Sequence, residues 1–274
     1  KHGLKSRAVG GVGHDDMGDW VLMKLQSFGI DTSLMMRCEG FTTSSSLVTT
    51  RPDGARPALH KRGATDGFFI EDSQIDDLLD TRILHVGGVG LMNRMDDSGR
   101  TEEILREAKK RGVITTLDVF ASTPADLPKV ARLLPYTDYF LPSEEEARAL
   151  SGLTGNRELA QFLLDRGAAC VILTLGADGA FYRHRDGTEF HTPAFQVEVK
   201  CTCGCGDCFN GGFATGLIKG LSPRDAVQLA QASSAQNATG LGSQAGVRDY
   251  ATTLEFIRTT PARASSDALV SASA

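Results

Sequence analysis

The chain has 274 residues, a formal net charge of −5 and 23% charged residues. This length accommodates one large α/β domain, or one domain with a small appendage. An acidic balance without a basic stripe argues against nucleic acid as a partner. No apolar run approaches the ~18 residues that span a bilayer, and the polar start lacks a signal-peptide core. We therefore expect a soluble, cytoplasmic protein without membrane partners.

The first elements predict a strand, a helix and a hairpin, in that order. Residues 8–12 form a short apolar run, and residues 17–28 have helical periodicity that ends at Gly29. The glycines nearby lack the G-x-G-x-x-G spacing, so a nicotinamide-dependent oxidoreductase ranks last among the alternatives. Residues 43–50 alternate, the turn sequence RPDG follows at 51–54, and 58–60 begin a return strand.

The middle of the chain alternates strand and helix patterns. We expect strands at 83–87, 113–119, 139–141 and 170–174, and helices at 101–111, 126–134, from 144 onward and at 156–167. Ser143 precedes three glutamates and predicts a helix N-cap. This rhythm predicts a mainly parallel, doubly wound sheet that binds ligands at the carboxyl ends of its strands.

The stretch from 195 to 217 predicts a strand, a glycine turn and a helix. Residues 195–199 alternate, GCGD follows at 204–207, and Phe209, Phe213 and Leu217 recur at helical spacing. The first amides of a helix lack internal partners and carry partial positive charge, and glycines let a phosphate approach them. The helix start also favours an ionised Asp207, which can accept a proton from a hydroxyl that attacks the phosphate.

A simpler interpretation of the same residues remains open. Asp207 can serve as a helix cap, and the glycines can make a tight turn without any ligand. Further on, Ser222 and Pro223 predict the start of an Ala-rich helix over 226–238, and 253–259 predicts a last helix. From residue 261 the tail is small and polar, so we expect 261–274 to be disordered.

Four of the six cysteines lie within eight residues, at 201, 203, 205 and 208. A cytoplasmic location argues against structural disulfides. Clustered thiols in one loop can bind a soft metal, although structural zinc sites usually have two separated pairs. One alternative is therefore a metal or redox protein built on this cluster. The other is that Cys205 fills a position that needs a small residue, where its backbone amide matters more than its thiol.

The motif over 201–213, with the Gly-Leu-Ser turn and Ala-rich helix behind it, resembles the C-terminal signature of the ribokinase-like (PfkB-type) carbohydrate kinases. The resemblance implies an α/β fold with a doubly wound, mainly parallel sheet, flanking helices and a small β lid. It places the kinase domain at 1–260 and the lid hairpin at 41–66. The implied reaction is ATP-dependent phosphorylation of a hydroxymethyl group of a sugar, and the lid is a candidate homodimer contact.

The resemblance also implies roles for individual residues. Asp207 falls on the family's catalytic base, and Gly204, Cys205 and Gly206 fall on its anion hole. Ser143 and Glu146 fall on an N-x-x-E motif linked to Mg²⁺. The ATP-binding positions correspond to Thr174, Gly176, Gly179, Gln231 and Gly242.

Three departures from the family pattern favour a second hypothesis. Ser143 replaces the motif's Asn, and Cys201 replaces an Asp that helps to hold a monovalent cation, so potassium activation is not expected. The family's first strand, with a sugar-binding Asp, and its Gly-Gly-x-x-x-N helix have no counterpart here. The alternative is therefore a catalytically impaired homologue that binds nucleotide or sugar.

Overall fold

The computed structural model describes residues 1–49, 58–120 and 123–264. Its centre is a six-stranded sheet in the order β10-β9-β8-β7-β6-β5. Four strands run parallel: β5 (Ile83–Val89), β6 (Ile114–Val119), β7 (Tyr139–Phe140) and β8 (Cys170–Thr174). Two antiparallel strands, β9 (Ala180–His184) and β10 (Glu189–Thr192), extend one edge. The expected mainly parallel α/β sheet is confirmed.

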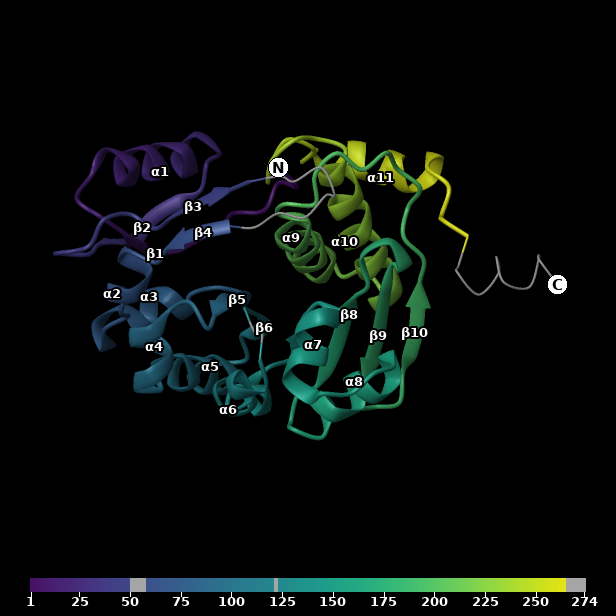
Figure 1. Cartoon of the computed structure of the whole chain (residues 1–274), viewed down its shortest axis with the longest axis horizontal. Coiled ribbons are helices and arrows are strands. Elements are labelled where there is room, and N and C mark those ends of the chain that lie inside the picture. Colours follow the sequence, from purple (N-terminus) through teal and green to yellow (C-terminus); the bar gives the residue numbers. More distant parts are fainter. Residues whose placement is uncertain (50–57, 121–122, 265–274) are drawn as a thin grey trace.

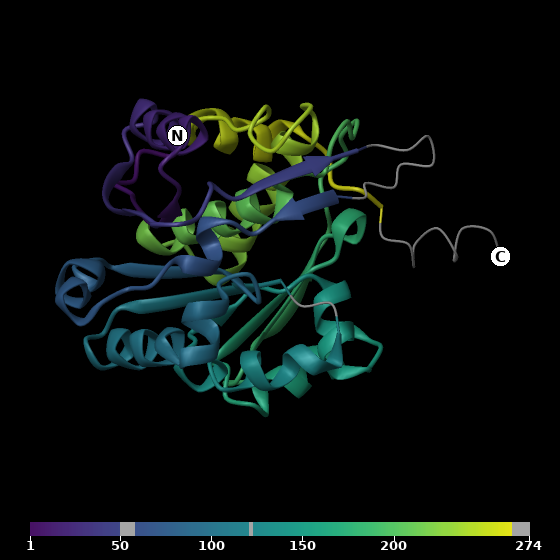
Figure 2. The same cartoon turned by 60° about the vertical axis from the view of Figure 1, so that its left-hand side comes forward.

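Two small sheets lie apart from the central one (Figures 1 and 2). The strands β1 (Arg7–Val12) and β2 (Asp31–Arg37) pair in parallel. The strands β3 (Ser45–Val48) and β4 (Ala58–Lys61) pair antiparallel, as the hairpin pattern predicted. The expected turn at 51–54 lies outside the described residues.

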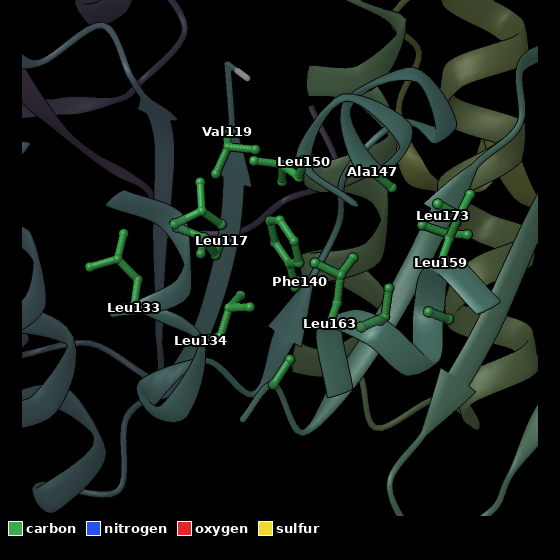
Figure 3. Close-up of a cluster of buried hydrophobic side chains, with 14 of the residues drawn as sticks. Leu117, Val119, Leu133, Leu134, Phe140, Ala147, Leu150, Leu159, Leu163 and Leu173 are labelled. Carbon is green, nitrogen blue, oxygen red and sulfur yellow. The ribbon is translucent and has the colours of Figure 1, made fainter. Parts of the chain in front are cut away.

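Helices cover both faces of the central sheet (Figure 1). One face carries α5 (Arg100–Lys110), α6 (Leu127–Ala131), α7 (Glu144–Ser151) and α8 (Asn156–Leu164), and the other carries α9 (Cys205–Ile218) and α10 (Pro223–Ala238). Side chains alternate between the faces of β8, so Val171 and Leu173 join the first core while Cys170 and Ile172 join the second. Phe140 lies at the centre of the first core (Figure 3).

The remaining elements surround this sandwich. They are α1 (Asp16–Ser27), α2 (Ala64–Gly67), α3 (Ile75–Leu79), α4 (Asn93–Ser98), α11 (Tyr250–Thr259) and the short 3₁₀ turns η1 (Asp72–Gln74), η2 (Pro124–Asp126), η3 (Leu134–Tyr136) and η4 (Gly176–Asp178). A third core joins β2 to α3, α4 and α5. Across the described ranges, no helix combines the length and apolar character that crossing a membrane requires.

Three expected elements differ from the structure. Residues 195–199 form no strand, because Phe195 bridges to Ala262 and the amide of Lys200 donates to Ala238 O. The same bridge orders residues 261–264, the first part of the expected disordered tail, and 265–274 lie outside the described residues. The helix expected at 126–134 divides into η2, α6 and η3, in a segment that carries prolines at 124, 128 and 135.

Candidate active site

The helix α9 begins at a turn that requires glycine. Gly204, its N-cap, has φ +71°, in the left-handed region that L side chains avoid. A Cβ at this position would come within 2.5 Å of Ser243 O. The close approach brings the loop that contains Gly242 against the motif. Gly204 therefore joins two segments that the sequence analysis assigned to the anion hole and to the ATP site.

The first turn of α9 presents backbone donors to open space. Within the described part of the chain, the amides of Gly206 and Asp207 have no backbone acceptor, whereas the amide of Cys208 donates to Gly204 O at 2.9 Å. Both residues are exposed, and a Cβ on Gly206 would meet no atom within 4 Å. Exposed amides at the positive end of a helix can receive an anion.

A cluster of carboxyl groups lies beside this helix terminus. Asn210, on the same side of α9 as Asp207, donates from Nδ2 to Asp118 Oδ2 at 2.7 Å. Burial and the charges of Glu146 and Asp207 raise the pKa of Asp118 to about 7, against the hydrogen bonds from Val119 and Asn210. Asp118 is the penultimate residue of β6 and Glu146 follows β7, so the parallel strands direct both groups to one edge of the sheet.

Ser143 and Glu146 form a capping box at the start of α7. The amide and hydroxyl of Ser143 donate to Glu146 Oε2 at 2.8 and 2.7 Å, and the amide of Glu146 donates to Ser143 Oγ at 3.2 Å. Burial raises the pKa of Glu146, against these hydrogen bonds. A backbone bridge pairs Ser143 with Thr174 at the end of β8. The predicted metal and ATP positions thus meet here.

The other predicted ATP positions differ in exposure. Gly176 and Gly179 have φ +58° and +99°, and a Cβ on Gly179 would lie 2.0 Å from Thr192 O. Gln231 is buried and donates to Thr192 O at 3.0 Å, so its amide ties α10 to β10. Gly242, at φ +100°, has open space around its Cβ position. The η4 turn and the Gly242 loop are therefore the parts that solvent reaches.

Sequence reasoning did not assign Asn210, Asp118 or His85 to the site. The signal for Asp118 was its place near the end of a predicted parallel strand. Desolvation by the surrounding protein lowers the pKa of His85, and the charge of Asp207 acts in the opposite direction, so the two groups are in electrostatic reach. His85 Nδ1 lies 2.9 Å from Thr116 Oγ1 on the neighbouring strand. No local pattern indicates these pairs.

The clustered cysteines surround the same turn without forming a metal centre. Cys201 is buried, and Cys203, Cys205 and Cys208 are half-buried. Among residues 1–49, 58–120 and 123–264, no group of three or more His, Cys, Asp or Glu side chains is arranged to hold a metal ion. Asn237 Nδ2 instead donates to Cys203 O at 2.8 Å, which holds the loop against α10.

Comparison with known proteins decides the family. The family model described as pfkB family carbohydrate kinase matches residues 1–249. The chain belongs to the PfkB family of carbohydrate kinases. The ribokinase of Haemophilus influenzae is 35% identical over 268 residues, which are 93% of this chain and 82% of that protein. The ATP-dependent 6-phosphofructokinase of Thermoanaerobacterium thermosaccharolyticum is 31% identical over 260 residues, 91% of this chain and 78% of that protein.

Solved structures of PfkB-type kinases have the same fold. The ribokinase of Thermotoga maritima matches with a TM-score of 0.77 and 25% identity, over 92% of this chain and 81% of that one. A candidate ribokinase II of E. coli, solved with ATP and Mg²⁺, matches with a TM-score of 0.79 and 23% identity, over 94% and 84%. The expected ribokinase-like fold and the assignment as a sugar kinase are thus confirmed.

Proposed function

We propose that the chain transfers the γ-phosphoryl group of ATP to a hydroxymethyl group of a sugar or sugar-like substrate. The observation that carries the proposal is the first turn of α9, where the exposed amides of Gly206 and Asp207 stand beside the Asp207 carboxylate. Asp207 would accept the proton of the attacking hydroxyl, and the amides would hold the charge that develops on the transferred group. Gly204 and Cys205 would position that turn.

The carboxyl cluster fits a divalent cation. Burial raises the pKa of both Asp118 and Glu146, the charge of Glu146 also raises the pKa of Asp118, and a cation relieves such repulsion. Mg²⁺ commonly binds one or two carboxylates together with substrate phosphates. Glu146, oriented by Ser143, would hold it with Asp118 nearby, and the ion would neutralise phosphate charge. The hydrogen bond from Asn210 would hold the Asp118 carboxylate against the first turns of α9.

The nucleotide would lie along the η4 turn and the Gly242 loop. Thr174 and Gly176 would approach the phosphates in this arrangement, and the buried Gly179 and Gln231 would support the wall from behind. The complex of the E. coli protein with ATP and Mg²⁺ supports this use of the fold. Thr174 joins the turn to Ser143 through its bridge, so the nucleotide and the cation would share one border of the site.

The hairpin β3–β4, within the expected lid at 41–66, would cover the sugar. Leu47 and Leu59 lie directly opposite each other, and both are strongly exposed, at 62% and 75%. An apolar face of this kind suits a contact with a second copy of the chain. We expect a homodimer through this face. The small-molecule substrate would bind between the hairpin and α9.

The proposal is tested by ATP consumption with Mg²⁺ against sugars, sugar phosphates, sugar acids and nucleosides. The relatives justify this panel, since they include a 6-phosphofructokinase, a 2-dehydro-3-deoxygluconokinase and an aminoimidazole riboside kinase. We expect substrate-dependent turnover that falls about 10²- to 10⁴-fold in Asp207→Asn, since a general base contributes that much. Asp225→Asn is the matched control, because Asp225 occupies the first turn of α10.

Two results would contradict the proposal. One is an Asp207→Asn variant that retains the parental rate. The other is a protein that neither turns over any substrate of the panel nor binds ATP in a calorimetric titration. Binding without turnover would instead support the impaired homologue.

A further inference from the structure

Two thiols flank Asp207 within the first turn of α9. The sequence Cys205-Gly-Asp-Cys208 places them three residues apart, and both side chains are half-buried while Asp207 is exposed. Residues three apart in an α-helix have Cα atoms about 5 Å apart, by the rise and radius of the helix. A disulfide spans Cα separations of roughly 4.4–6.8 Å. The backbone therefore brings this pair within bonding reach.

We propose that Cys205 and Cys208 form a reversible disulfide that disables the phosphate-binding turn. The inference rests on the proposed function of that turn. The proposal gives a role to the two thiols on either side of the proposed base. Phosphoryl transfer itself uses neither thiol. The oxidant is a low-molecular-weight disulfide such as glutathione disulfide.

The chemistry balances as two exchange steps. The Cys205 thiolate attacks one sulfur of glutathione disulfide, which forms a mixed disulfide and releases one glutathione thiolate. The Cys208 thiolate then attacks the Cys205 sulfur and releases the second glutathione. The two protein thiols are oxidised, the small disulfide is reduced to two thiols, and the two protein protons pass to the released thiolates.

The order of the two attacks follows from position. Cys205 is the first residue of α9, whereas Cys208 lies nearly one turn further into the helix. Burial, together with the nearby Cys205 and Asp207, raises the pKa of Cys208 to about 12. Cys205 therefore reacts first and Cys208 resolves the mixed disulfide.

Closing the bond must disturb the turn. Cys205 Sγ now points to α10, 3.5 Å from Ser234 O and 3.9 Å from Asn237 Nδ2. Cβ atoms three apart in a helix are about 5–6 Å apart, whereas a disulfide needs roughly 3.8 Å. The first turn therefore has to tighten, and the amides of Gly206 and Asp207 move with it. A displacement of about 1 Å at reacting groups can cost roughly 10²-fold in rate.

The other cysteines are less suited to this exchange. Cys201 is only 5% exposed, and its amide is bonded to Ala238 O. Cys170 is buried within the sheet, and burial raises its pKa strongly. Cys38 belongs to the distant third core. Cys203, half-buried in the same loop, is the competing partner that the experiment has to separate.

The test compares the parent chain with Cys208→Ser and, as a control, Cys38→Ser, before and after exposure to glutathione disulfide. Trypsin releases residues 201–219 as one peptide, since lysines stand at 200 and 219. Remaining thiols are therefore alkylated before digestion, and fragment ions locate the bridge. Kinase rate and ATP affinity are measured on the same samples, and again after dithiothreitol.

We expect a Cys205–Cys208 bridge in the parent and in Cys38→Ser, with at least tenfold losses of rate and ATP affinity that dithiothreitol reverses. Cys208→Ser should keep its rate and affinity after the same exposure. A bridge between Cys201 and Cys203 alone, or equal losses in Cys208→Ser, would overturn the inference. If no substrate is turned over, the proposed function fails separately, and a 205–208 bridge that leaves ATP affinity unchanged overturns the switch.

Discussion

Gly204 and Gly206 stand two residues apart, and the structure gives them opposite constraints. Gly204 has a positive φ and touches Ser243 O, whereas Gly206 is helical and faces open space. We expect Gly204→Ala to destabilise the fold by about 1–3 kcal/mol, because it adds left-handed strain and a backbone clash. Gly206→Ala should leave stability within about 1 kcal/mol but reduce ATP turnover, since its methyl group would occupy the anion site.

Thermal denaturation and steady-state rates on both variants check this pair. The informative quantity is the difference between the two variants in stability and in rate, because both changes add one methyl group to the same turn. A Gly206→Ala variant with parental turnover would show that the open space does not receive a phosphate. A Gly204→Ala variant with parental stability would show that the contact with the Gly242 loop is not needed.

Asp118 predicts a pH dependence of stability. Its pKa is raised from 3.8 to about 7 on folding, so the folded state binds more protons than the unfolded state between these values. The stability contribution is therefore present below about pH 4 and is lost as pH rises through about 7. In the parent, this loss in the free energy of unfolding should amount to on the order of a few kcal/mol, and Asp118→Asn should make it smaller. Urea denaturation from pH 5 to 8 measures it, and parallel parent and variant curves would contradict the prediction.

At the scale of elements, the contact between α9 and α10 depends on small residues. A Cβ on Gly212 would lie 2.7 Å from Ala230 Cα and from Ser233 Oγ, whereas a Cβ on Gly211 would meet no atom within 4 Å. We expect Gly212→Ala to destabilise by about 1–3 kcal/mol through overpacking. Gly211→Ala, the matched control, should be neutral or stabilise by up to about 1 kcal/mol. Equal melting temperatures for the two variants would contradict this packing argument.

At the scale of the whole molecule, protection from solvent is uneven. Strands β6, β7 and β8 have neighbours on both sides and helices on both faces, whereas β3 and β4 form a separate, exposed pair. We therefore expect native-state amide exchange to be slowest in β6–β8 and fastest in β3–β4. Hydrogen–deuterium exchange with peptide mapping measures the order. Protection of β3–β4 equal to that of β8, in dilute protein, would contradict it.

Local patterns in the sequence determined most of the elements. The alternation of strands and helices, the N-caps at Ser143 and Ser222, and the glycine turn before Asp207 depend on residues a few positions apart, and the structure has all of them. Such signals work because capping, periodicity and turn conformation are short-range effects. Placement of Thr174, Ser143 and Glu146 at one edge also followed, since parallel strands end together.

The tertiary structure alone decided the pairings between distant segments. The bond from Asn210 to Asp118 joins residues 92 positions apart, and the contact of Gly204 with Ser243 joins two loops. Residues 195–199 have a strand pattern, yet Phe195 bridges to Ala262 and the amide of Gln196 donates to Pro261 O, near the other end of the described chain. Periodicity describes what a segment can bury, whereas its partners depend on which surfaces the folded chain brings to it.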